Sequence, residues 1–333
     1  MEYRNLGKTQ LKVSAFAMGT YQLSGALCID GKADGFPDIG YEEAVRLIHF
    51  CEDQGINVVD SAEIYGAGEG ERRVGSALKG RRDRWIISTK FGWRVGEQGN
   101  RITDSHSSTI RTSLEGSLRR LNTDYVDIYL YHTPPHIEDI EKGISVLESL
   151  KQEGKIRFYG ISTDSPIVLS SLLDRGNIDV VQFEQSLLKK PRKMLELSIK
   201  NNLGIMGRGA LSSGMLSGKY FHNKPQLSHE DIRKDWFDST NLNQFSTYER
   251  LVPPDCSMVM LALRYLLDIN TSHTIVLGGK STSNYKESLQ ALEIPPLSPS
   301  LHKQLANISR LFYLKRAMTS VRYKGQKLLK KLI

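Results

Sequence analysis

Three observations predict an α/β fold for this chain of 333 residues, with eight parallel strands and their helices closed into a (β/α)8 TIM barrel. Short apolar runs alternate with longer segments of helical periodicity along most of the chain. Three successive strand-like runs end at or next to Asp60, Lys90 and His132. The phosphate-binding pattern GxGxxG, typical of an open doubly wound sheet, is absent after the first strand.

The N-terminal region predicts a hairpin, one barrel strand and a long connection. Residues 3–6 and 11–13 have the composition of short strands and are separated by a turn. The first barrel strand is expected at residues 15–18, ending at Gly19. Residues 24–40 are rich in Gly and Asp and contain one Pro, so we expect a loop longer than most strand-to-helix connections.

From residue 41 onward, strands and helices alternate. Seven further strands are expected at residues 57–59, 85–89, 126–131, 156–161, 180–183, 204–206 and 273–277. Helices are expected at residues 41–54, 69–78, 107–121, 137–152, 166–175, 191–201, 257–268 and 284–292. The run GAGEG imitates only part of the phosphate fingerprint and follows a tyrosine in a loop, so it is better interpreted as a turn into the second helix.

Composition indicates a globular protein with a sizeable core, since 39% of the residues are hydrophobic and 25% are charged. No apolar run approaches the roughly 18 residues of a membrane span. The first residues lack the apolar stretch of a signal peptide. Cys28, Cys51 and Cys256 lack metal-ligand spacing, so we expect reduced thiols, no metal site and a cytoplasmic location.

The net charge of +8 is unevenly distributed. Nine Lys and Arg residues and no Asp or Glu follow Ile294, so the preceding chain is close to neutral. We therefore predict a barrel domain at residues 1–315 and a basic extension at residues 316–333. The extension suggests a nucleic-acid or anionic-membrane surface as one alternative. A charged, solvated face is the more usual explanation, and we do not expect a nucleic-acid partner.

The strand ends resemble the aldo-keto reductase superfamily, whose catalytic tetrad is an Asp, a Tyr, a Lys and a His. The matching positions are Asp60, Tyr65, Lys90 and His132. Flanking matches are Gly19-Thr20, Tyr65-Gly66 with Glu71, Gly160-Ile161-Ser162, Val181-Gln182-Phe183, the run LSSGMLSGKY that ends at Tyr220, and Leu277-Gly278-Gly279-Lys280-Ser281. They follow the family order over most of the chain. The resemblance implies that the N-terminal hairpin plugs the bottom of the barrel.

The four matched residues suit carbonyl reduction, which needs a hydride at carbon and a proton at oxygen. Tyr65 can donate the proton, and a nearby Lys90 ammonium lowers a phenol pKa from its usual value of about 10. Asp60 would keep Lys90 charged, and His132 would orient the substrate oxygen. Each also has an ordinary explanation: a loop aromatic, a structural ion pair and a half-buried histidine.

The resemblance implies a nicotinamide cofactor. The carboxamide would be held by Ser162, Thr163 and Gln182, with Arg208 at the position of the stacking aromatic. Thr163 replaces the usual Asn and lacks its amide, whereas an Arg208 guanidinium can lie flat against a ring. The pyrophosphate would lie along Leu211, Ser213, Gly214, Leu216, Ser217 and Lys219. Further cofactor contacts are expected from Gly19, Thr20, Tyr21 and Asp60.

The resemblance favours NADP(H) over NAD(H). Gly278, Lys280 and Ser281 match the segment that grips the 2′-phosphate, where a cation and a hydroxyl near a helix N-terminus suit a dianion. Two neighbouring positions depart from the family, with Asn284 for Gln and Ser288 for Asn, while the acidic Glu287 is kept. Ser281 and Lys280 forming a plain helix cap is the alternative.

Substrate contacts are expected from Tyr21, Tyr65, Trp93 and His132, together with the loop at residues 24–40 and the segment 220–254, where Trp236 and Phe237 add apolar surface. We therefore predict an NADP(H)-dependent carbonyl reductase or alcohol dehydrogenase with a small-molecule substrate. It would be either a monomer or a homo-oligomer. The alternative is a regulatory protein that keeps the barrel and cofactor, as the potassium-channel β subunits of this superfamily do.

Overall fold

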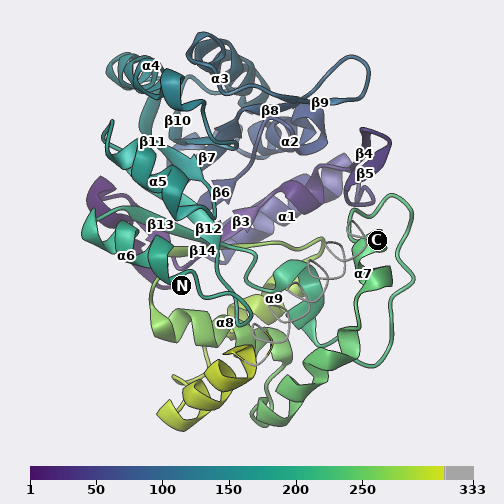
Figure 1. Ribbon diagram of the computed structural model, residues 1–333. Coiled ribbons are helices and arrows are strands. Elements are labelled where there is room, and N and C mark those ends of the chain that lie inside the picture. Colours follow the sequence, from purple (N-terminus) through teal and green to yellow (C-terminus); the bar gives the residue numbers. More distant parts are fainter. Residues whose placement is uncertain (311, 313–333) are drawn as a thin grey trace, which may run out of the picture.

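Eight parallel strands form a closed barrel in the computed structural model, which describes residues 1–310 and 312 (Figure 1). Around the barrel the order is β10-β11-β12-β13-β14-β3-β6-β7. The strands are β3 (Phe16–Gly19), β6 (Val58–Asp60), β7 (Ile86–Phe91), β10 (Val126–Tyr131), β11 (Ile156–Ser162), β12 (Val180–Glu184), β13 (Gly204–Arg208) and β14 (Thr274–Leu277). The predicted barrel is confirmed, and each strand lies within a residue or two of its expected position.

Helices alternate with these strands and surround the barrel (Figure 1). They are α1 (Tyr41–Asp53), α2 (Glu69–Ala77), α3 (Ser107–Leu121), α4 (Ile140–Gln152), α5 (Pro166–Leu173), α6 (Arg192–Lys200), α8 (Met258–Ile269) and α9 (Thr282–Gln290). Because the helices cover the outer face of the barrel, its strands are buried on both faces. Every residue of β7 and β10 is buried, as expected for such a sheet.

The N-terminal hairpin packs against the amino ends of the barrel strands. Its strands β1 (Tyr3–Asn5) and β2 (Lys12–Ser14) pair antiparallel. Three apolar side chains of the hairpin and its flanks share a buried cluster with residues at or near the starts of barrel strands. Those three side chains are Leu6, Leu11 and Val13.

The expectation of a loop at residues 24–40 is wrong, because a second hairpin forms there. Its strands are β4 (Ala26–Ile29) and β5 (Lys32–Gly35). The intervening Asp30 and Gly31 have φ of 51° and 72°, as a two-residue type I′ turn requires. The Asp-Gly pair was the sequence signal for this hairpin.

A third hairpin, not predicted from the sequence, follows β7. Its strands are β8 (Trp93–Val95) and β9 (Arg101–Thr103). Asp30 N donates to the carbonyl oxygen of Gly99 at 3.0 Å, so this hairpin touches the β4–β5 hairpin.

The segment between β13 and α8 is partly helical. These pieces are the 3₁₀ segments Ser212–Ser217 and Leu242–Leu251 and the short helix α7 (Lys234–Ser239). Residues 299–310 are also helical, and Phe312 packs against Phe245 and Tyr248 of this segment. The predicted domain boundary at residue 315 and the basic extension 316–333 lie outside the described residues.

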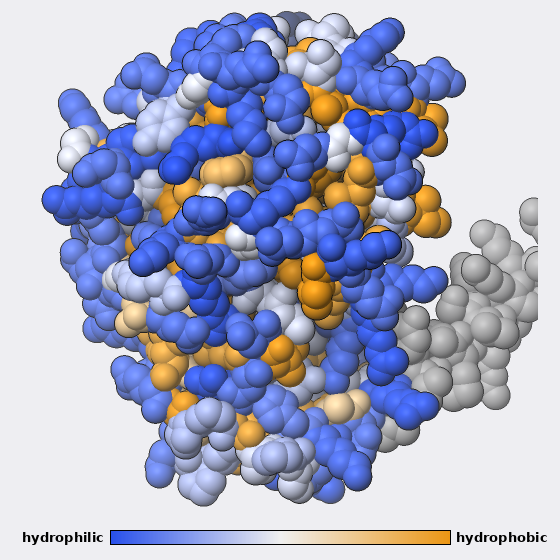
Figure 2. All heavy atoms as spheres, turned by 90° about the vertical axis from the view of Figure 1, so that its left-hand side faces the viewer, coloured by the Kyte–Doolittle hydropathy of each residue, from blue (hydrophilic) through white to orange (hydrophobic). Residues whose placement is uncertain are grey.

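Hydrophilic side chains cover most of the face shown in Figure 2, with apolar groups scattered between them. Within residues 1–310 and 312, no helix is long and apolar enough to cross a membrane.

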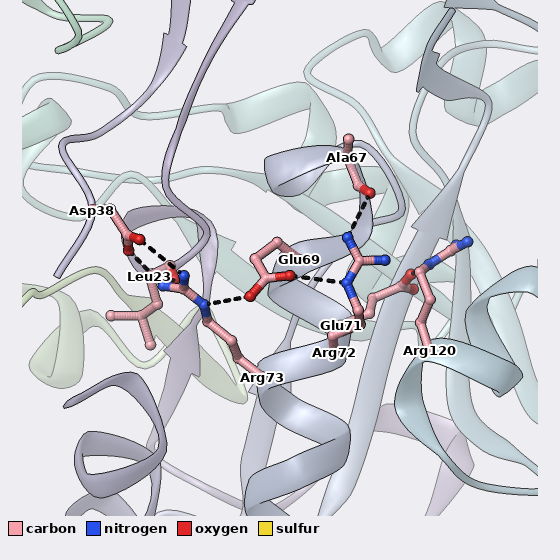
Figure 3. A network of polar contacts seen from close by, with 8 residues as sticks. All are labelled: Leu23, Asp38, Ala67, Glu69, Glu71, Arg72, Arg73 and Arg120. Atoms are coloured by element: carbon pink, nitrogen blue, oxygen red, sulfur yellow. Dashed lines mark hydrogen bonds and ion pairs between the residues drawn. The ribbon is translucent and has the colours of Figure 1, made fainter. Parts of the chain in front are cut away.

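Charged residues of α2 form a network of ion pairs with neighbouring elements (Figure 3). Glu71 is fully buried, where it accepts hydrogen bonds from Arg120 Nε of α3 and from Thr89 Oγ1 of β7, both at 2.6 Å. Arg73 donates to Asp38 and to the carbonyl oxygen of Leu23, on either side of the β4–β5 hairpin. The network therefore fixes α2 both to the barrel and to this hairpin.

Replacing Arg120 by Met should destabilise the protein by about 3–5 kcal/mol, because the Glu71 carboxylate would remain buried without its cation. Arg72→Met is the matched control, since Arg72 pairs with Glu69 at a half-exposed position and its loss should cost less than about 1 kcal/mol. Urea denaturation measures both. Equal costs for the two variants would contradict the assignment of Glu71 as a buried paired carboxylate.

Candidate active site

The carboxyl ends of β6, β7 and β10 bring the predicted tetrad together. Asp60 is the last residue of β6, Lys90 lies near the end of β7, and His132 follows β10. Tyr65 lies in the 3₁₀ segment Tyr65–Gly68 that leads into α2. Residues that are far apart in the sequence thus meet at the edge where barrels carry their sites.

Asp60 and Lys90 form a buried ion pair. Lys90 Nζ is 2.7 Å from Asp60 Oδ2, and it also donates to the carbonyl oxygen of Ser61 at 2.7 Å. Ser88 Oγ donates to the other carboxylate oxygen at 2.8 Å. Burial disfavours the Lys90 ammonium, but Asp60 and Tyr65 outweigh it and the net pKa shift is upward. Lys90 is therefore a fixed cation at neutral pH.

Tyr65 is a further neighbour of this ammonium. Its hydroxyl is 3.5 Å from Lys90 Nζ. Burial raises the pKa of Tyr65, Lys90 acts in the opposite direction, and the net shift is upward. The Tyr65 phenol is therefore protonated at neutral pH, with a cation beside it that stabilises the phenolate.

His132 completes the group, with its ring centroid 5.7 Å from that of Tyr65. Burial, together with the charges of Lys90 and Arg208, holds the pKa of His132 well below its usual value. The imidazole is thus neutral at pH 7. Its Nδ1 is buried without a hydrogen-bond partner among the described residues.

The two unexpected hairpins hold aromatic side chains against this group. The Tyr21 ring lies 4.7 Å from the Tyr65 ring, and the Tyr21 hydroxyl donates to Asp34 of β5 at 2.8 Å. Trp93 of β8 lies 4.7 Å from the His132 ring. Arg101 of β9 joins the hairpins through Asp34, at 2.5 Å. The predicted substrate contacts therefore form one connected wall.

A cavity of about 590 Å³ opens beside Asp60 and Tyr65, within the range of small-molecule sites. Most of the predicted cofactor residues line it. They are Gly19, Thr20, Tyr21, Asp60, Gln182, Arg208, Leu211, Ser213, Gly214, Ser217, Lys219, Gly278, Lys280, Asn284, Glu287 and Ser288.

Four predicted cofactor residues are not part of this lining. Leu216 is fully buried in the apolar core. Ser281 caps α9, where its Oγ accepts from Asn284 N at 3.3 Å. Thr163 Oγ1 accepts from the backbone N–H of Ser165 at 3.2 Å. The fourth, Ser162, is hydrogen-bonded to Gln182, which does line the cavity.

Ser162 and Gln182 form a polar pair at the ends of β11 and β12. Ser162 Oγ donates to Gln182 Oε1 at 3.0 Å. Gln182 Nε2 is buried and has no hydrogen-bond partner within the described residues. The side chain of Gln182, which lines the cavity, therefore keeps a donor available.

Arg208 ends β13 and lines the cavity, and its Nη2 is 2.9 Å from Asp164 Oδ2. This ion pair fixes the guanidinium at the position where the family resemblance implied a stacking group.

Several cavity residues were not singled out from the sequence. Among them are Gln22, Phe36, Ile232 and Arg233, and none of these four belongs to a recognisable motif or period. Trp236 lines the cavity as expected, but Phe237 does not, because it is fully buried in the core.

Arg233 and Lys280 make one end of the cavity cationic. Arg233 is held by Asp231 in a bidentate pair at 2.7 and 2.8 Å. Both cations lie over the ring of Phe36, with Arg233 Cζ at 5.1 Å and Lys280 Nζ at 5.7 Å from its centroid. An anionic group of a ligand would meet two positive charges here.

No group of three or more His, Cys, Asp or Glu residues able to hold a metal ion occurs in residues 1–310 and 312.

The barrel carries four juxtaposed polar residues beside a cavity, and comparisons with known proteins identify the class of protein to which it belongs. The sequence model of the Aldo/keto reductase family matches residues 17–310. The chain therefore belongs to the aldo/keto reductase family. Members of this family act on carbonyl compounds and use nicotinamide cofactors.

Individual relatives are similar over almost their whole length. The "Uncharacterized oxidoreductase YqkF" of Bacillus subtilis is 30% identical over 297 residues, covering 87% of this chain and 91% of the relative. The "NADH-specific methylglyoxal reductase" of Escherichia coli is 29% identical over 309 residues, covering 87% and 93%. Among solved structures, the holo form of aldo-keto reductase AKR11C1 from Bacillus halodurans has a TM-score of 0.78 at 30% identity, covering 92% and 96%.

Replacing Lys90 by Met should cost about 3–5 kcal/mol of folding free energy, because the Asp60 carboxylate would stay buried without its cation. Adding Asp60→Asn to this variant removes the uncompensated charge and should recover part of that loss. Urea denaturation of the two single variants and the double variant measures the coupling. A Lys90→Met cost below about 1 kcal/mol, or no recovery in the double variant, would contradict a buried pair.

Proposed function

We propose that the protein is an NADP(H)-dependent reductase of aldehydes or ketones, which also runs in the direction of alcohol oxidation, with Tyr65 as the proton donor. The observation that carries the proposal is the Lys90 ammonium, which lies 2.7 Å from Asp60 and 3.5 Å from the Tyr65 hydroxyl beside the cavity. A phenol next to a buried, permanently charged ammonium can donate its proton, because the resulting phenolate is stabilised until it is protonated again.

The proton chemistry follows from the charges of the side chains. Lys90 stabilises the phenolate that Tyr65 becomes after donating its proton to the carbonyl oxygen. Asp60 keeps Lys90 charged, so the ammonium is present before, during and after the transfer. The alternative regulatory role does not require this arrangement, and the intact tetrad geometry favours retained chemistry.

Neutral His132 serves as a hydrogen-bond partner for the substrate oxygen. Because its pKa is held low by burial and nearby cations, it does not compete with Tyr65 as an acid near pH 7. Together with Trp93 and Tyr21, it limits the orientations that a carbonyl group can adopt beside Tyr65.

The residues present fit a nicotinamide nucleotide. The unpartnered Gln182 amide nitrogen offers a donor to a carboxamide, and Ser162 fixes its orientation. When bound, the nicotinamide supplies or accepts the hydride. Leu211, Ser213 and Gly214 line the cavity, and the small side chains of Ser213 and Gly214 allow backbone groups to approach a pyrophosphate.

The cationic end of the cavity supports the preference for NADP(H). Lys280 and Arg233 meet over Phe36, where a 2′-phosphate of close to two negative charges would be stabilised. One relative is named NADH-specific, so the cofactor preference of this chain has to be measured directly. The family and the reduced-cysteine composition support a cytoplasmic location within this proposal.

Tyr65→Phe should lower carbonyl reduction by about 10²- to 10⁴-fold, since only the proton donor is removed. Nucleotide binding should persist, because the phenol ring and the rest of the cavity remain. Nicotinamide absorbance with a panel of aldehydes and ketones measures turnover, and fluorescence titration measures binding. Turnover above about a tenth of the wild-type rate would show that another group is the acid.

Lys280→Ala should weaken NADPH binding by about one to two decades, because a charge-assisted contact is worth about 1.5 to 3 kcal/mol. NADH lacks the phosphate and should bind almost unchanged. Raising the ionic strength should shrink the difference. Lys286→Ala on α9 is the matched control, since Lys286 lies outside the cavity lining. If Lys280→Ala weakened the binding of NADPH and NADH equally, Lys280 would not contact the 2′-phosphate and would be part of a helix cap only.

A further inference from the structure

Glu63 is a buried carboxylic acid between two members of the tetrad. It lies three residues after Asp60 and two before Tyr65, and it is only 9% exposed. It does not line the large cavity, and the hydrogen bond of its side chain goes to Gly92 rather than to a tetrad side chain. A buried carboxylate in a loop is costly unless a donor meets it.

The donor is the turn that follows β7. Glu63 Oε1 accepts from Gly92 N at 3.0 Å, and Glu63 N donates to the carbonyl oxygen of Lys90 at 3.1 Å. The two bonds hold the backbone on both sides of Phe91. Glu63 therefore ties the Asp60-to-Tyr65 segment to the strand end that carries Lys90.

The turn requires glycine at residue 92, and glycine is the residue with the greatest backbone freedom. Gly92 has φ of 108°, and a Cβ atom there would lie 2.6 Å from Ser105 Oγ and 2.7 Å from Thr133 Cγ2. Only glycine fits this conformation and this space. The position of the turn thus depends on the bonds that its backbone makes, and the side chain of Glu63 supplies one of them.

The turn places two residues of the site at once. Lys90 lies two residues before Gly92, and Trp93 follows it with its ring 4.7 Å from His132. We infer that Glu63 is a positioning residue of the reductase site, holding the Gly92 turn so that Lys90 and Trp93 keep their places against Tyr65 and His132. This inference rests on the proposed reductase function.

The charges around Glu63 make this contact sensitive to pH. Burial raises the pKa of Glu63 to about 7, with the Gly92 N–H acting in the opposite direction. The charged or titratable groups that face it are Glu71 on α2, Arg120 on α3, Arg94 on β8 and Tyr129 on β10. Above pH 7 the carboxylate binds the amide as a charge-assisted acceptor, and below pH 7 the neutral acid binds it more weakly.

Two variants separate the hydrogen bond from the charge. Glu63→Leu removes the acceptor, so kcat should fall by about 10- to 100-fold, as expected when reacting groups move slightly. The NADPH dissociation constant should change less than twofold, because Glu63 and Gly92 lie outside the cavity lining. Glu63→Gln keeps an acceptor oxygen and should recover most of the lost kcat. Glu97→Leu, at an exposed position in the β8–β9 hairpin, is the control.

Hydrogen exchange and a pH profile complete the test. Peptides that contain the Gly92 amide should exchange faster in Glu63→Leu than in the wild type or in Glu63→Gln. In the wild type kcat should decline as the pH falls through about 7, at most to the level of Glu63→Gln because the neutral acid keeps an acceptor oxygen, and this limb should be absent from Glu63→Gln. If Glu63→Leu has the same kcat and the same exchange rate at Gly92 as the wild type, the inference is wrong.

Other outcomes remain decisive. If Glu63→Leu does not fold, the pH profile of Glu63→Gln decides, and an unchanged limb near pH 7 overturns the inference.

Because the wild-type acid has a raised pKa, its ionisation opposes folding as the pH rises from about 4.5 to about 7. Glu63→Gln should therefore gain Tm relative to the wild type over that interval. A wild type that binds NADPH but reduces no carbonyl refutes the proposed function, whereas exchange at Gly92 tests the contact independently.

Discussion

The rest of the structure depends on the burial of the Lys90 ammonium. A fully buried cation is tolerated only with a paired anion, and Asp60 supplies that anion at 2.7 Å. The contact exists because β6 and β7 are parallel neighbours, with Asp60 opposite Ser88 in the register. Shifting either strand by one residue would turn one partner away from the other and leave a charge in the core. The Asp60–Lys90 ion pair therefore constrains the register of β6 and β7 and also forms part of the candidate site.

Chain segments outside the barrel pattern convert this pair into an enclosed site. The β4–β5 and β8–β9 hairpins meet through Arg101 and Asp34, and they bring Tyr21 and Trp93 against the tetrad. The segment between β13 and α8 supplies Arg233 and Trp236 to the cavity wall. The barrel thus positions the ionisable groups, while the insertions decide which molecules reach them.

The amino-acid sequence by itself predicted the barrel and the positions of the ionisable residues of the candidate site. Runs such as residues 126–131 are short and mostly β-branched or aromatic, and the helices between them have a 3.6-residue period, so local patterns were sufficient for the barrel. The ionisable residues at the strand ends could be placed at one edge, because parallel strands in a barrel all end on the same side. The Asp30-Gly31 hairpin was also encoded locally, although the glycine-rich composition of its surroundings indicated a loop.

Tertiary structure alone decided how the remaining residues are used. Trp236 and Phe237 are adjacent aromatic residues, yet one lines the cavity and the other is fully buried, because packing of distant segments selects between them. Arg233 reaches the cavity through its pair with Asp231 in a segment without periodicity. Glu63 has the sequence context of an exposed loop residue, but its acceptor role depends on Gly92, across a strand boundary. Such contacts depend on long-range geometry, which no local pattern of residues records.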